Sequence, residues 1–196
     1  MDFEKDRFPL INNYAGFSSK GINNSLRKDP QSQDIDLERR LNIELEEIEP
    51  YSNRIAFAHD LYTGIPFEIL SKWYLKRIST IIEFPNFLSS SKCKWCDYET
   101  CYEIRTNNFS KGRDIQNIVC KDSEKEVLFK SRSLFKIILV DHKNNTIHLD
   151  EVYSGEIITV LNEGVFLRDK DISDLYEAHL GQSDNDEPSL SDKGEI

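Results

Sequence analysis

The C-terminal half of the chain alternates short runs of β-branched and aromatic residues with tight-turn sequences, and this pattern most limits the possible folds. The runs SLFKIILVDH and TIHLDEVY are separated by KNN, and later runs by SG and NEG, which are typical hairpin connections. Connections this short join neighbouring antiparallel strands. Residues 125–180 are therefore predicted to form an antiparallel β-meander or a small barrel with a terminal helix over residues 171–180.

Helical periodicity marks the N-terminal half instead. Four aliphatic residues recur at spacings of four, four and three before Pro50, which places them on one stripe of a helix over residues 34–49. These residues are Leu37, Leu41, Leu45 and Ile48. Further helices are predicted over residues 52–62 and from Pro66 to about residue 82. The expected fold class is α+β, with a helical N-terminal half that contains a helix-turn-helix-like pair.

The second and third of these helices carry the pattern of a DNA-reading pair. A small residue, Ala58, precedes Gly64 in the break, and Leu70 and Trp73 follow the glycine by six and nine residues. This stretch resembles the general helix-turn-helix motif, except that Ala58 lies farther from the glycine than is usual. The resemblance implies that the third helix enters a major groove. The alternative is two core helices with a solvated basic edge.

Residues that would contact nucleic acid are the exposed polar and basic ones of the third helix and of a basic loop beyond it. They are Ser71, Lys72, Lys76, Arg77, Arg105, Lys111 and Arg113.

Four cysteines fall within a short window of the chain, with the spacing C-x2-C-x4-C-x18-C. They are Cys93, Cys96, Cys101 and Cys120. A C-x2-C turn can direct two thiolates at one metal ion, so a structural zinc site is predicted. His142 or His148 could replace Cys101 as a ligand. Buried free cysteines and a redox C-x2-C pair are the alternatives.

The charge distribution limits the partners. The net charge is −10, but residues 51–133 carry 10 acids and 13 bases, a net charge of +3, between two acidic ends. No apolar run reaches the roughly 18–20 residues of a membrane span. The sequence MDFEKDRFPL has acids where a secretory signal has bases. We therefore expect a cytoplasmic, non-secreted protein that does not bind membranes.

These features predict five segments. They are a loosely structured arm (1–33), the helical region (34–86), a zinc knuckle (87–124), the β-meander with its terminal helix (125–180) and a disordered acidic tail (181–196).

No sequence signature of an enzyme is apparent. The chain lacks a phosphate-binding glycine-rich loop, H-E-x-x-H and G-x-S-x-G. A nucleophilic Cys93 with His59 as its base is the one enzymatic alternative. The sequence therefore favours a non-enzymatic, zinc-stabilised regulator that binds nucleic acid, as a homodimer or as a subunit of a complex. The alternative is an acidic interaction module, such as an inhibitor or immunity-type protein, that covers a basic protein partner.

Overall fold

A single mixed β-sheet dominates the protein. The computed structural model describes residues 7–15, 21–23, 26, 35–59, 65–95, 99–119, 125–153 and 167–168. Its helices are α2 (Pro9–Asn13), α4 (Ile35–Glu46) and α5 (Phe67–Leu75). Its strands are β1 (Ile55–His59), β2 (Ile81–Phe84), β3 (Leu88–Ser91), β4 (Cys101–Arg105), β5 (Gly112–Asp114), β6 (Glu126–Phe129), β7 (Ser133–Asp141), β8 (Thr146–Glu151) and β9 (Leu167–Arg168).

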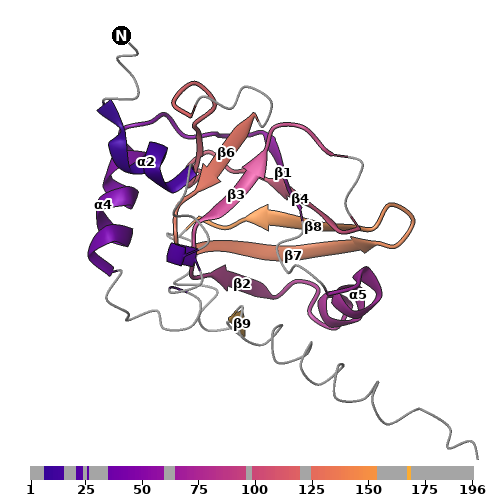
Figure 1. The fold of residues 1–196 in the computed structure, drawn as a ribbon. Helices are drawn as coiled ribbons and strands as arrows, with labels where there is room; N and C mark the ends of the chain where they lie inside the picture. Colours follow the sequence, from indigo (N-terminus) through magenta and orange to yellow (C-terminus); the bar gives the residue numbers. More distant parts are fainter. Residues whose placement is uncertain are drawn as a thin grey trace, which may run out of the picture.

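The strand order in the sheet is β5-β6-β3-β1-β4-β8-β7-β2-β9. The β4–β8 and β2–β9 pairs are parallel, and the other neighbours are antiparallel. Helices α2 and α4 lie at one end of the sheet and α5 at the other (Figure 1). None of the helices in the described part of the chain is long and apolar enough to cross a bilayer.

Two hydrophobic cores lie on opposite faces of the sheet. Val127 and Phe129 of β6 belong to the core that includes α5, whereas Leu128 between them belongs to the core under α2 and α4. This division follows from the two-residue period of a strand. Strand β6 is therefore buried on both faces, and its first residue, Glu126, points to the same face as Leu128.

The helix predicted over residues 34–49 is present as α4. Its buried Leu41 and Leu45 contact the sheet, as the periodicity indicates. The acidic C-terminal half of α4 binds the start of α2. The Glu44 carboxylate accepts hydrogen bonds from the backbone N–H groups of Leu10 and Ile11 at 3.1 and 3.0 Å. This carboxylate satisfies donors in the first turn of α2 that the helix itself leaves without partners.

The prediction of a helix-turn-helix pair is wrong. Its first helix is replaced by strand β1, which pairs with β3 and β4. Ala56 and Ala58 are fully buried in this strand, and their small side chains let the α5 core pack closely against it. The third predicted helix is α5, but it ends at Leu75 instead of continuing to residue 82. Ser79 then adopts a φ of 71°, and the β-branched Ile81 and Ile82 continue as β2.

The predicted β-meander or barrel is also wrong. Strands β7 and β8 form a hairpin, but β6 pairs with β3 and β5 instead of with β7. The segment predicted as a zinc knuckle supplies β3, β4 and β5 of the same sheet. The α+β division into a helical half and a β half therefore fails, because strands from both halves alternate in one sheet. The predicted helix at 171–180 and the acidic tail lie outside the described residues.

Candidate functional site

The residues predicted to bind nucleic acid do not form one surface. In α5, Ser71 is buried and donates to the Glu68 carbonyl, while the Arg77 guanidinium lies 4.1 Å from the centre of the Trp73 ring. Lys72 of α5 and Lys76, directly after its end, are exposed. The buried Arg113 instead donates to the Leu45 carbonyl of α4, at the opposite end of the sheet from α5 (Figure 1).

The two remaining residues of that set also lie away from α5. Arg105 in β4 is exposed and lies 3.8 Å from Asp150 of β8. Lys111 lines a cavity beside α4. Helix α5, the predicted DNA-reading helix, mainly packs into the core.

The cysteines do not form a metal centre in the described part of the chain. Cys93 is exposed and Cys101 is buried, while Cys96 and Cys120 lie outside the described residues. The alternative histidine ligands have other contacts, since His142 packs on the Phe67 ring and the His148 Nδ1 atom lies 3.2 Å from Glu103. No group of three or more potential metal ligands occurs among these residues.

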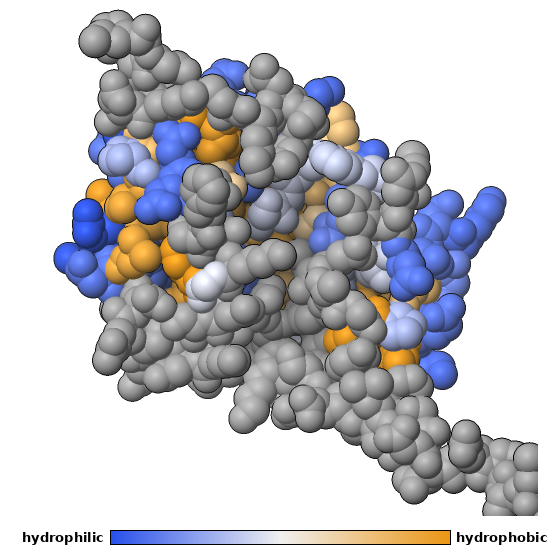
Figure 2. Space-filling model, viewed as in Figure 1, coloured by the Kyte–Doolittle hydropathy of each residue, from blue (hydrophilic) through white to orange (hydrophobic). Residues whose placement is uncertain are grey.

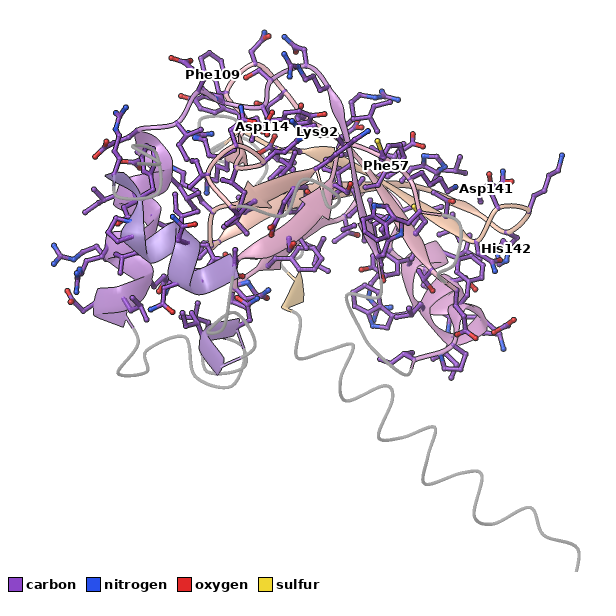
Figure 3. All side chains as sticks on the ribbon, turned by 45° about the horizontal axis from the view of Figure 1, so that its top comes forward. Phe57, Lys92, Phe109, Asp114, Asp141 and His142 are labelled. Atoms are coloured by element: carbon purple, nitrogen blue, oxygen red, sulfur yellow. The ribbon has the colours of Figure 1, made fainter. Side chains whose placement is uncertain are left out.

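A cavity opens where β1, β3 and β6 lie near one another in the sheet. It has a volume of about 260 Å³. Strand β3 pairs with both β1 and β6, so residues on one face of the three strands, such as Phe57, Ser91 and Glu126, lie around the same space. Figure 3 shows Phe57 on the sheet, with Lys92 and Asp114 close together beyond the end of β3. The cavity is lined by Phe57, His59, Ser89, Ser90, Ser91, Trp95 and Glu126.

A hydrogen-bonded carboxylate is the main chemical feature of this cavity. Glu126 is the first residue of β6, and it is 7% exposed. The Ser89 hydroxyl donates to its Oε1 atom at 2.7 Å. The next residue, Ser90, donates to the Val127 carbonyl at 2.7 Å and so ties β3 to β6 beside the carboxylate. The buried carboxylate is thus held in a fixed position at the wall of the cavity.

The segment after β3 forms the remaining wall. The Ser91 hydroxyl oxygen accepts hydrogen bonds from the Trp95 indole N–H at 3.1 Å and from the Cys93 backbone N–H at 3.2 Å. The Trp95 backbone N–H donates to the His59 Nε2 atom at 3.3 Å. These contacts connect Trp95 to β1 and β3. The cavity therefore combines two aromatic walls, an imidazole and a carboxylate, a combination that suits a flat ring attached to a polar group.

Solved structures of other proteins share this fold. The chain is similar to ADP-ribosyltransferases. With an ADP-ribosyltransferase of Clostridium botulinum it shares 18% identity at a TM-score of 0.60, over 76% of this chain and 89% of that one. With an ADP-ribosyltransferase toxin of Paenibacillus larvae it shares 13% identity at a TM-score of 0.61, over 76% of this chain and 87% of that one. With a protein of S. aureus that was solved with NAD it shares 16% identity at a TM-score of 0.57, over 74% of this chain and 85% of that one.

Sequence comparison adds no relative to these structures. No protein-family model matches the chain. No curated protein matches it either.

The functional predictions from sequence require correction. Because the chain shares its fold with ADP-ribosyltransferases, the prediction of a non-enzymatic regulator that binds nucleic acid is wrong, and so is the alternative of an acidic inhibitor. The predicted structural zinc is also wrong, since the described residues hold no metal-binding group, and the described strands of the cysteine-rich segment, β3, β4 and β5, are held in the sheet.

Sequence reasoning missed most of the cavity residues. The run Ser89, Ser90 and Ser91 indicates a loop, because serine is a poor strand former. Glu126 falls in a predicted meander strand, and His59 in a predicted helix. One signal was present: alternation in IAFAH puts Phe57 and His59 on one face of a strand. The pairing of β3 with β6, which brings Ser89 to Glu126, has no local sequence signal.

Proposed function

We propose that the chain is an ADP-ribosyltransferase that uses NAD as its substrate. The observation that carries this proposal is the hydrogen bond between Ser89 and Glu126 inside an aromatic-walled cavity. The fold similarity to ADP-ribosyltransferases over about three quarters of the chain supports it.

The cavity fits one end of NAD. Its volume of about 260 Å³ is enough for the nicotinamide ring and its ribose, but not for the whole dinucleotide. Phe57 and Trp95 offer ring faces on which nicotinamide can stack. Lys125, next to Glu126 in the chain, is exposed with its ammonium group 3.5 Å from the Cys93 sulfur, and it offers positive charge suited to the pyrophosphate.

The chemistry requires a fixed negative charge beside the ribose. When bound, NAD supplies an ADP-ribosyl group whose bond to nicotinamide breaks with the electron pair leaving on the ring nitrogen. Positive charge then develops on the ribose, as in glycoside cleavage. The Glu126 carboxylate stabilises this charge, and Ser89 keeps the carboxylate in place. An acceptor nucleophile forms the new bond to the ribose carbon and loses its proton to a base.

Replacement of the carboxylate tests the proposal. We expect the full chain to release nicotinamide from NAD, and Glu126→Gln to reduce this rate by about 100- to 1,000-fold, because the amide keeps the shape but loses the charge. Nicotinamide release, measured by chromatography, needs no knowledge of the acceptor, since water can take its place.

Two comparisons make this test specific. Glu103→Gln changes a partly exposed carboxylate of β4 that does not line the cavity, and we expect it to retain the activity. A folded wild-type chain that leaves NAD intact, or a Glu126→Gln variant with full activity, would contradict the proposed function.

A further inference from the structure

A second and larger cavity lies between α4 and the turn that joins β6 to β7. Its volume is about 540 Å³, which is within the usual range for small-molecule sites. Figure 2 shows apolar and hydrophilic side chains mixed over the α4 side of the molecule. The cavity is lined by Glu38, Arg39, Asn42, Ile43, Glu46, Lys111, Lys130, Ser131 and Arg132.

Positive charge predominates in this lining. Four of the residues are basic and two are acidic, although the whole chain has a net charge of −10. A positively charged cavity in a negatively charged protein raises the local concentration of small anions. The lining therefore indicates an anionic ligand.

Among the basic residues of this cavity, Lys111 has the positive charge that is least compensated by a carboxylate. Its Nζ atom donates to the Arg132 carbonyl at 2.9 Å, and no carboxylate of the described residues lies within ion-pair distance of it. An ammonium group has three N–H donors, so two remain for a ligand. Burial lowers the pKa of Lys111, and the nearby Lys130 lowers it further, while Glu151 and Glu83 act in the opposite direction. An anion placed between the two lysines would offset that burial and repulsion.

Lys130 has a partner that an anion can replace. Its Nζ atom lies 2.8 Å from the Glu46 Oε1 atom, and that bond lowers the pKa of Glu46. The Lys130 side chain is only 14% exposed, whereas that of Glu46 is 63% exposed. Ion pairs with an exposed member contribute little to stability. The Glu46 side chain can therefore rotate into solvent with a small loss of free energy.

The far wall of the cavity is rigid. The buried Glu38 accepts hydrogen bonds from the Ser131 hydroxyl at 2.6 Å and from the Arg132 Nε atom at 3.2 Å. Asn42 donates to the same hydroxyl at 2.7 Å. The turn is therefore fixed to α4 before any ligand arrives, which lowers the entropic cost of binding. The half-exposed Ile43 supplies an apolar surface beside these groups.

We propose that this cavity binds the phosphate group of a small molecule through Lys111 and Lys130. A compact anion can reach two partly buried ammonium groups inside a pocket. A nucleic acid or a large acidic protein would instead meet the repulsion of the whole chain. The aliphatic stems of the lysines and Ile43 leave room for an organic body attached to the phosphate.

This site is separate from the candidate active site. Both lie along β6, but Glu126 begins the strand and Lys130 follows its end, about 13 Å away at 3.3 Å per residue. The inference consequently does not depend on the proposed transferase activity, and its test needs no NAD.

Calorimetric titration of the full chain with sodium phosphate, and separately with AMP, tests the proposal at constant ionic strength. We expect one site per chain. Lys111→Met and Lys130→Met should each weaken binding roughly tenfold or more, because each removes a charge-assisted hydrogen bond while it keeps the length of the side chain. Tighter binding of AMP than of phosphate would identify a phosphate ester as the ligand, and equal binding would identify free phosphate.

Two control variants locate the bound anion. Lys143→Met removes an exposed lysine in the β7–β8 turn, and Trp95→Ala alters the candidate active site, so neither should change the affinity. Absence of binding to the wild type, or loss of binding in Trp95→Ala but not in Lys111→Met, would overturn the inference. Binding of hexaglutamate that phosphate does not displace would also overturn it.

A measurement on the wild-type chain covers the case in which a lysine variant does not fold. Lysines are acetylated in the presence and absence of AMP, and the modified peptides are quantified by mass spectrometry. We expect AMP to protect Lys111 and Lys130 at least threefold and to leave Lys143 unprotected. Equal acetylation of all three lysines with and without AMP would contradict the proposed site.

Discussion

Cys93 and Cys101 occupy opposite environments, although both belong to the cluster that suggested a metal site. Cys93 is exposed beside Lys125, with 3.5 Å between the sulfur and Nζ atoms. Cys101 is 3% exposed at the start of β4, and burial raises the pKa of its thiol to about 11. Since the thiolate is the reactive form, the two residues should differ strongly in reactivity.

We therefore expect iodoacetamide at pH 8 to modify Cys93 at least tenfold faster than Cys101 in the folded chain, because a thiol with a pKa near 11 is almost wholly protonated there. Peptide mass spectrometry at timed intervals measures both rates. In urea the two rates should converge, which serves as the control. Equal rates in the folded protein would mean that the start of β4 opens readily to solvent.

At the scale of elements, the β7–β8 hairpin depends on one backbone conformation. Asn145 has a φ of 47°, in the left-handed region that asparagine and glycine tolerate and β-branched residues do not. Asn145→Val should lower the free energy of unfolding by about 1–2 kcal/mol, whereas Asn145→Gly should change it by less than about 1 kcal/mol. Urea denaturation measures both. Equal stability of the two variants would show that the turn can adopt another conformation.

Elements were predictable from the sequence where local pattern alone determines them. Helix α4 follows from its apolar stripe, and the β7–β8 hairpin follows from the KNN turn between two apolar runs. Strand β1 was missed because alanines at positions 56 and 58 suit a helix locally, and burial between two other strands decides its conformation. Tertiary context overrides propensity in such a short segment.

The candidate site was less predictable than the elements because non-local pairing creates it. Ser89 and Glu126 become neighbours only when β3 and β6 pair across a long stretch of chain. Their hydrogen bond therefore depends on strand order, which periodicity does not report. Composition was misleading for a related reason: the net charge of −10 is a sum over the whole chain, whereas the candidate site centres on one carboxylate.

At the scale of the whole molecule, the sheet joins its two cores into one structure. Strand β6 contributes residues to both, since Val127 faces the core with α5 and Leu128 lies in the core with α4, and the chain passes from one core to the other between Phe87 and Leu88 at the start of β3. Loss of packing in the α4 core should therefore weaken the strands that carry the candidate site. Small domains with such shared elements usually unfold in one cooperative transition.

Leu45→Ala and Ile43→Ala test this coupling as a matched pair on α4. Leu45 is fully buried and Ile43 is 50% exposed, so we expect losses of about 2–4 kcal/mol for the former and less than about 1 kcal/mol for the latter. In a Trp95→Phe background the remaining Trp73 reports on the opposite core, and denaturation followed by circular dichroism and by its fluorescence should give one coincident transition. Separate midpoints for the two signals in Leu45→Ala would show that the α4 core unfolds independently and that the sheet does not couple the two faces.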